Sequence, residues 1–160
     1  MTLFHGGTDK IEKPVIRILP ASRDFGAGFY CTDIKEQAEK WARRQGRIRN
    51  KTPILNIYNF DINTARQNLN CHFFSDYAIE WLELILKCRK DASYKHGFDI
   101  VYGKIANDDV GETVQAVLNG FMPMDFALQR LKFMHANNQY CFCTEKSLEF
   151  LKYSNSVNLD

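Results

Sequence analysis

GAGFYCTD, residues 26–33, places two glycines directly before a short apolar strand that carries Tyr30. Upstream, FHGG at residues 4–7 ends another apolar strand with His5 beside two further glycines. Glycine lets a backbone turn sharply or approach a ligand closely. A third strand, QYCFC at residues 139–143, opens with a polar side chain near the C-terminus. The three strands therefore predict a site built from two rings and an amide.

Length and composition predict a single domain over residues 1–160. Hydrophobic residues make up 45% and charged residues 25%, which are ordinary globular values. The net charge of +2 gives no whole-chain field that favours nucleic acid or a membrane. No run reaches the roughly 18 apolar residues of a membrane span. The most basic stretch, Lys40 to Lys51, is interpreted as a solvated helix end and loop, with contact to phosphate of a nucleotide or nucleic acid as the alternative.

The five cysteines favour free thiols over disulfides. Their number is odd and no secretory leader is recognisable, so we expect a protein of the reducing cytoplasm. Cys141 and Cys143 have strand spacing and should face the same side. No second Cys or His pair stands at metal-binding spacing, so no metal site is expected. Asp24-Phe25-Gly26 matches a kinase tripeptide without the other kinase motifs, and we interpret it as a coincidence.

Short strands interspersed with helices predict an α+β fold. Apolar periodicity predicts five helices: after Asp33 to about Gly46, from Ser75 or Asp76 to Leu86, and over 110–118, 124–134 and 145–151. It predicts five strands, over residues 2–5, 29–32, 53–60, 98–102 and 139–143. Asp33, with Glu36 three residues later, is the expected N-terminal capping box of the first helix. Residues 11–24 read as a loop, and the last residues as an edge strand or a frayed end.

In this order the motifs resemble the ADP-ribosyltransferase superfamily, most closely its diphtheria-toxin and poly(ADP-ribose) polymerase branch. His5-Gly6 is similar to the branch's His-Gly, and residues 26–33 to its Gly-x-Gly-aromatic-Tyr motif. Trp41 follows Tyr30 by eleven residues, where the branch often has a second aromatic. Gln139 stands where the branch has its catalytic Glu, which gives a His-Tyr-Gln triad like that of small bacterial toxin-type members. The resemblance implies a split, mainly antiparallel β core with flanking helices.

The resemblance also implies the roles of individual residues. NAD would be the substrate, and His5, Tyr30 and Gln139 would be catalytic. NAD would be bound by five residues: His5, Gly6, Gly28, Tyr30 and Trp41. His5 would bind a ribose hydroxyl, the Gly6 backbone would bind the nicotinamide carboxamide, and the aromatic rings would stack on nicotinamide. Gln139 accepts a hydrogen bond but supplies no negative charge. The charge of the transition state is therefore expected to be offset by a nearby carboxylate, with Asp108, Asp109 and Glu145 as candidates, or by a group of the acceptor.

The leading functional hypothesis is mono-ADP-ribosyl transfer from NAD to an unidentified protein or nucleic acid. The resemblance is to bacterial toxins, which implies a possible antitoxin protein as partner. Two alternatives stay open. In one, the protein is an NAD glycohydrolase that passes ADP-ribose to water. In the other, it is a non-catalytic module that binds NAD or another nucleotide, which Gln139 favours.

Overall fold

The computed structural model describes residues 1–18, 23–106, 108–134 and 137–159 of the chain. Helices and strands are mixed along the sequence, as the patterns predict for an α+β fold. In chain order they are β1 (Thr2–Gly7), β2 (Phe29–Cys31), α1 (Lys35–Arg49), β3 (Ile54–Phe60), α2 (Ile62–Asn68), β4 (Cys71–Phe73), α3 (Ile79–Lys90), β5 (Ile100–Lys104), α4 (Asp108–Leu118), α5 (Met124–Leu131), β6 (Asn138–Phe142), α6 (Glu145–Leu148) and β7 (Leu151–Asn158).

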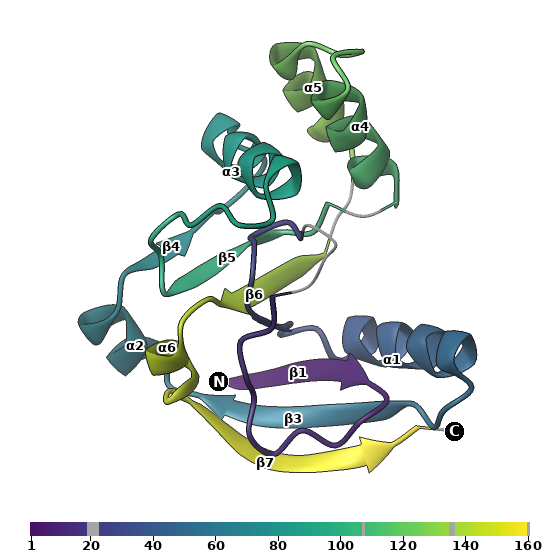
Figure 1. Ribbon diagram of the computed structural model, residues 1–160, viewed down its shortest axis with the longest axis vertical. Coiled ribbons are helices and arrows are strands. Elements are labelled where there is room, and N and C mark those ends of the chain that lie inside the picture. Colours follow the sequence, from purple (N-terminus) through teal and green to yellow (C-terminus); the bar gives the residue numbers. More distant parts are fainter. Residues whose placement is uncertain (19–22, 107, 135–136, 160) are drawn as a thin grey trace.

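The strands form two sheets, which confirms the expected split and mainly antiparallel β core. The first sheet has the order β1-β3-β7 and is antiparallel throughout. The second has the order β2-β6-β5-β4, in which only the β4-β5 pair is parallel. In Figure 1, α3, α4 and α5 lie above the second sheet, and the first sheet lies below the second with α1 beside β1. The two sheets meet where Phe4 of β1 bridges Thr32, next to the end of β2, through hydrogen bonds of 2.8 and 2.9 Å.

Two apolar clusters stabilise this arrangement. One lies between the sheets and joins Leu3, Tyr58 and Phe60 of the first sheet to Tyr140 and Phe142 of the second. The other packs α3, α4 and α5 against the second sheet, with buried side chains that include Trp81, Leu82, Ile85, Val101, Val114 and Leu131. Burial of such side chains is the main favourable contribution to folding. The core thus holds β1, β2 and β6 in fixed relation to one another.

Helix α1 lies against β1 through small side chains. Ala38, Ala42 and Gly46 are its buried residues and recur every four positions, so they share one face. Gly6 allows the close approach, because a Cβ there would overlap the Ala38 carbonyl oxygen. The expected capping box is wrong: Ile34 is the N-cap residue and makes no side-chain cap bond. The hydroxyl of Thr32 instead accepts a hydrogen bond from the Ile34 N–H at 3.1 Å.

Other differences from the sequence-based elements are short or lie at chain ends. Helix α2 and strand β4 were not predicted; α2 begins after Asp61, whose carboxylate accepts a hydrogen bond from the Thr64 N–H at 3.1 Å. The C-terminal segment is the edge strand β7 rather than a frayed end. Within the described residues, the helices are too short or too polar to cross a lipid bilayer.

Candidate functional site

A cavity of about 580 Å³ lies where β1, β2, β6 and α1 come together. Residues from six parts of the chain line it: Phe4, His5, Gly6, Arg23, Asp24, Tyr30, Cys31, Thr32, Gln37, Ala38, Lys40, Trp41, Arg44, Ile105, Ala106, Asn137 and Gln139. The set includes every site residue expected from the sequence except Gly28. The fold therefore brings residues far apart in the chain to one concave surface.

Gly28 serves the packing of β2 instead of the cavity surface. A Cβ at this position would overlap the Cys141 sulfur and lie 2.7 Å from the Phe142 carbonyl oxygen. Glycine is needed there because the chain enters β2 in direct contact with β6. Gly28 is not among the described residues that line the cavity, and its predicted contact with NAD stays a prediction.

His5 is held as a neutral ring with one nitrogen committed to the backbone. Its Nδ1 lies 2.7 Å from the Tyr30 carbonyl oxygen, and its ring stacks on Phe29 at 4.5 Å between centroids. Burial lowers the pKa of His5; the Tyr30 carbonyl opposes this, and the charge of Arg23 adds to it. A carbonyl only accepts, so Nδ1 carries the proton and Nε2 is the acceptor of the neutral ring. His5 can therefore accept a hydrogen bond from a ligand hydroxyl.

The hydroxyl of Tyr30 ties the preceding loop to β2. It accepts a hydrogen bond from the Phe25 N–H at 3.1 Å and donates one to the Gly26 carbonyl at 2.7 Å. Gly26 has a φ of 78°, a left-handed conformation that glycine adopts without strain. Burial raises the pKa of Tyr30 well above its usual value, so the hydroxyl stays protonated. The same residue thus lines the cavity and fixes the loop that carries Asp24.

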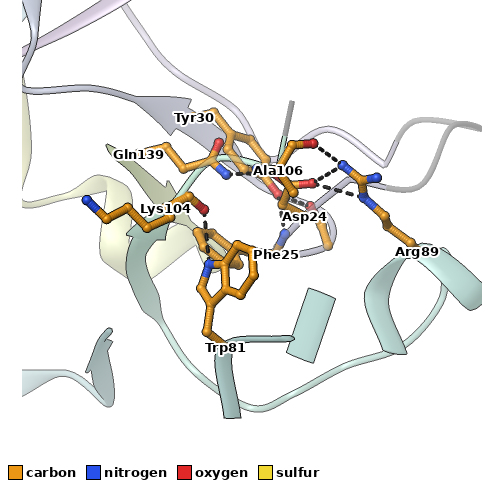
Figure 2. Close-up of polar contacts among 9 residues, drawn as sticks. Asp24, Phe25, Tyr30, Trp81, Arg89, Lys104, Ala106 and Gln139 are labelled. Carbon is orange, nitrogen blue, oxygen red and sulfur yellow. Dashed lines mark hydrogen bonds and ion pairs between the residues drawn. The ribbon is translucent and has the colours of Figure 1, made fainter. Parts of the chain in front are cut away.

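Gln139 is oriented by a buried carboxylate. Its side-chain nitrogen donates a hydrogen bond to Oδ2 of Asp24 at 3.0 Å. Figure 2 shows the amide nitrogen directed toward Asp24 and the amide oxygen directed away from it. Gln139 is only 8% exposed. This contact selects one of the two ways the amide can be turned and leaves the oxygen as the group available to a ligand.

Asp24 connects four distant segments of the chain (Figure 2). Its Oδ1 accepts two hydrogen bonds from the guanidinium of Arg89, at 3.1 and 2.6 Å. Its Oδ2 accepts one from the Ala106 N–H at 2.8 Å in addition to that from Gln139. A carboxylate with this many donors, one of them charged, is strongly held. Its negative charge is compensated locally by Arg89.

Sequence reasoning missed Asp24. The sequence shows it only as part of a coincidental tripeptide. The partners that mark Asp24 lie on α3, on the segment after β5 and on β6, far away in the chain. A polar residue in a loop gives no sequence signal of burial. The expected carboxylates do not replace it: among the described residues, Asp109 and Glu145 are exposed and do not line the cavity, and the Asp108 side chain lies outside the part that the structure describes.

Helix α1 contributes a basic and aromatic rim. Lys40, Trp41 and Arg44 line the cavity, and Trp41 is 46% exposed. The guanidinium of Arg44 lies 5.7 Å from the centroid of the Trp41 ring. Arg23, from the loop before β2, adds another cation 5.5 Å from the centroid of Tyr30. Since the Asp24 charge is already paired with Arg89, the lining favours an anionic ligand.

Gln37 presents a buried acceptor that was also missed. Its side-chain nitrogen donates to the Asn138 carbonyl at 3.2 Å. Its Oε1 is buried and, within the described residues, has no hydrogen-bond partner. Buried polar atoms are nearly always paired, and Gln37 belongs to the cavity lining. The unpaired oxygen therefore fits a ligand N–H or hydroxyl.

Comparison with known proteins identifies a family. The family described as "Protein of unknown function (DUF3990)" matches residues 1–153. The chain belongs to this family. The matched region contains all the cavity-lining residues of this DUF3990 chain, from Phe4 to Gln139. No curated protein and no solved structure matches the chain.

Proposed function

We propose that this DUF3990 protein is a mono-ADP-ribosyltransferase that moves ADP-ribose from NAD to a macromolecular acceptor. The observation that carries the proposal is the shared cavity of His5, Tyr30 and Gln139, with Gly6 and Trp41 on its wall. These are the residues to which the resemblance assigns NAD binding and catalysis. They come from separate segments, so their convergence supports one common site.

The lining fits the chemistry of NAD. A volume of about 580 Å³ lies within the range of small-molecule sites, roughly 300–1,000 Å³. Arg23, Lys40 and Arg44 suit the two phosphates of a dinucleotide. Nε2 of His5 and the side-chain oxygen of Gln139 are acceptors for ribose hydroxyls. The unpaired Oε1 of Gln37 is a buried acceptor for an amide or amino group.

Transfer requires exchange of one bond at the ribose. The bond from ribose C1 to the nicotinamide nitrogen breaks and its electron pair leaves with nicotinamide, while an oxygen or nitrogen of the acceptor bonds to C1 and releases its proton to water. Positive charge develops on the ribose, and groups positioned beforehand to hold it lower the barrier. Gln139 holds a hydroxyl through its oxygen. Asp24 is a positioning residue, because Arg89 compensates its charge and its Oδ2 fixes the Gln139 amide.

Two other activities are compatible with the same cavity. Water as the acceptor would make the protein an NAD glycohydrolase. A non-catalytic NAD or nucleotide-binding module is favoured by one observation, the neutral Gln139 in place of a carboxylate. The resemblance also supports a cytoplasmic bacterial toxin with an antitoxin partner, and this belongs to the proposal.

The test follows nicotinamide and ADP-ribose separately. Purified protein is incubated with cell extract and NAD labelled in its adenosine part, and free nicotinamide and label on macromolecules are measured. We expect both to appear, and Gln139→Ala to lower the rate about 10²–10³-fold, the usual effect of removing one contact to a transition state. Gln129→Ala, an exposed change on α5, is the control.

Each alternative gives a different result in the same assay. Release of nicotinamide without label on any macromolecule would indicate a glycohydrolase. Thermal stabilisation by NAD without release of nicotinamide would indicate a binding module; full occupancy at a hundredfold excess over Kd is worth about 2.7 kcal/mol. If millimolar NAD caused no thermal stabilisation and no nicotinamide were released, the site assignment would be rejected.

A further inference from the structure

The second half of α1 and the two residues that follow it carry an unusual concentration of positive charge. Residues 40–51 contain six basic side chains and no Asp or Glu: Lys40, Arg43, Arg44, Arg47, Arg49 and Lys51. All six residues are exposed. The whole chain has a net charge of only +2, so this cluster is a local feature.

The cations of α1 form a row that starts at the cavity. Lys40, Arg44 and Arg47 recur at spacings of four and three residues, so they share one face of the helix. The opposite face, with Ala38 and Ala42, is buried against β1. Lys40 and Arg44 line the cavity, whereas Arg47 and Arg49 do not. The basic row therefore leads from the cavity mouth outward along α1.

Among the described residues, two acidic side chains near this row are paired with other cations. Glu39 pairs with Lys35 at 3.6 Å, and Lys51 pairs with Asp9 at 3.7 Å. Neither contact involves Lys40, Arg44 or Arg47. A surface that combines several exposed cations with little acidic charge attracts polyanions.

Trp41 adds a specific feature to the charge. It lies at the cavity rim, is 46% exposed and has the Arg44 guanidinium 5.7 Å from its ring centroid. Exposure of a Trp costs hydrophobic free energy unless a ligand covers it. Proteins that hold single-stranded nucleic acids combine aromatic rings, on which bases stack, with a basic track for the phosphates. A duplex offers no unstacked base to such a ring.

We propose that the α1 face formed by Lys40, Trp41, Arg44 and Arg47 binds single-stranded nucleic acid and presents it at the cavity mouth as the acceptor of ADP-ribose. The acceptor role rests on the proposed function, whereas binding to this face requires no NAD. An oxygen or nitrogen of the strand forms the new bond to ribose C1, nicotinamide leaves with the electron pair of the old bond, and the proton of the acceptor goes to water. The face and the cavity meet at Trp41 and Arg44, which places strand and NAD next to each other.

The first measurement is binding without NAD. Fluorescence anisotropy of a labelled single strand of about 16 nucleotides is recorded with the full chain at about 50 and 200 mM salt. Three phosphate contacts predict a slope near −2 in log affinity against log salt, so affinity should fall about 20-fold over this range. The change Arg47→Gln should lower the magnitude of this slope by about 0.7. It should leave thermal stabilisation by NAD unchanged, since Arg47 does not line the cavity.

Matched variants separate stacking from charge. Trp41→Ala should weaken binding of the strand about 5- to 150-fold at constant salt, the usual range for loss of one stacked base. Phe121→Ala removes an aromatic side chain that is 83% exposed between α4 and α5, and should have no effect. Arg130→Gln with Lys132→Gln removes two exposed cations from the α5 region and should also have none.

Three results would overturn the surface assignment: no binding, equal binding of the matching duplex, or equal binding of an acidic polyglutamate peptide at the same salt. The last would indicate an acidic protein as partner. The second measurement adds labelled NAD to the strand. Transfer of label that decreases in the Arg47→Gln variant supports the acceptor role. Binding without transfer, under conditions in which proteins of the extract become labelled, would overturn the acceptor role and leave the proposed transferase intact.

Discussion

At the scale of single residues, the orientation of Gln139 depends on Asp24. A lone glutamine on a strand could present either its oxygen or its nitrogen to a ligand. Here the nitrogen is used by Oδ2 of Asp24 at 3.0 Å. The pair therefore acts as an acceptor toward the cavity, as a glutamate would, but without net charge because Arg89 neutralises Asp24. This explains how a glutamine can hold a ribose hydroxyl in the proposed reaction.

His5 gives a complementary case, in which the protein keeps a titratable ring neutral. Nδ1 faces the Tyr30 carbonyl at 2.7 Å, and burial lowers the pKa of His5. In the folded protein, His5 therefore takes up its second ring proton at a lower pH than in the unfolded chain, where histidines titrate near 6.5. Over the window below about 6.5 the unfolded state binds more protons, so stability falls as the pH falls.

We expect protonation of His5 to contribute to the pH dependence of the free energy of unfolding. Between about pH 8 and pH 5, wild-type protein should lose free energy of unfolding with a contribution from His5 of at most about 1.4 kcal/mol per pH unit. His5→Asn should lack this contribution, while His72→Asn on β4, away from the cavity lining, should retain it. Urea unfolding at both pH values measures the difference. An equal loss in wild type and His5→Asn would contradict the neutral state of the partly buried His5 ring.

At the scale of elements, periodicity predicted the regular segments well and their ends less well. Strand β3 and helices α1 and α4 lie close to the expected ranges, because their apolar residues repeat over several turns or pairs. Helix α3 (Ile79–Lys90) is shifted by about one turn toward the C-terminus from the expected range, Ser75 or Asp76 to Leu86. Helix α2 has seven residues and β4 has three, too few for a period to be recognised. The start of α1 was misplaced because Thr32, which bridges to β1, supplies the hydroxyl in place of the cap expected from Asp33.

For the candidate site, too, some residues could be predicted from the sequence and others could not. His5, Tyr30 and Gln139 could be predicted because ordered motifs surround them, and the structure brings all three to one cavity. Asp24 and Gln37 could not, because what marks them is burial and contacts to distant segments. Such properties arise only when the chain is folded. The roles of all these residues in NAD chemistry remain predictions.

The two glycines after His5 provide a test of how α1 is placed. A Cβ at Gly6 would overlap the Ala38 carbonyl oxygen, so Gly6→Ala should force α1 away from β1 and lower the free energy of unfolding by about 1–3 kcal/mol or more. A Cβ at Gly7 meets nothing closer than His5 Nε2 at 3.6 Å. Gly7→Ala should therefore change stability by less than about 0.5 kcal/mol.

Chemical unfolding of both glycine variants, together with NAD-induced thermal stabilisation, distinguishes packing from ligand contact. Displacement of α1 moves Lys40, Trp41 and Arg44, so Gly6→Ala should also weaken stabilisation by NAD. If Gly6→Ala were as stable as Gly7→Ala, the close contact between β1 and α1 would be wrong.

At the scale of the whole molecule, the cavity walls are held together by two kinds of contact. The apolar cluster between the sheets places β1 against β6. The carboxylate of Asp24 then joins the loop before β2 to α3, to the segment after β5 and to β6. Its side chain is 10% exposed and that of Arg89 is 19% exposed. One buried ion pair thus links the cavity lining to the helical layer that covers the second sheet.

Breaking this ion pair should destabilise the whole fold and the site together. Asp24→Asn leaves the Arg89 charge without its partner, and removal of one member of a buried pair costs about 3–5 kcal/mol. Arg89→Met should cost a similar amount, because Asp24 is then left charged. The double variant should cost clearly less than the sum of the two, since no unpaired charge remains. Urea unfolding of the four proteins gives the coupling free energy, and additive effects would show that the two side chains do not act as a pair.

The site supplies an independent readout of the same ion pair. In the double variant of Asp24→Asn with Arg89→Met, the introduced asparagine would still offer an amide oxygen to the Gln139 nitrogen, so stabilisation by NAD should recover with the fold. Asp24→Leu with Arg89→Met removes that acceptor, because leucine has no polar atom in its side chain. This second pair of changes should leave NAD binding weak even where stability is regained. Equal stabilisation of the two double variants by NAD would show that Asp24 does not position Gln139.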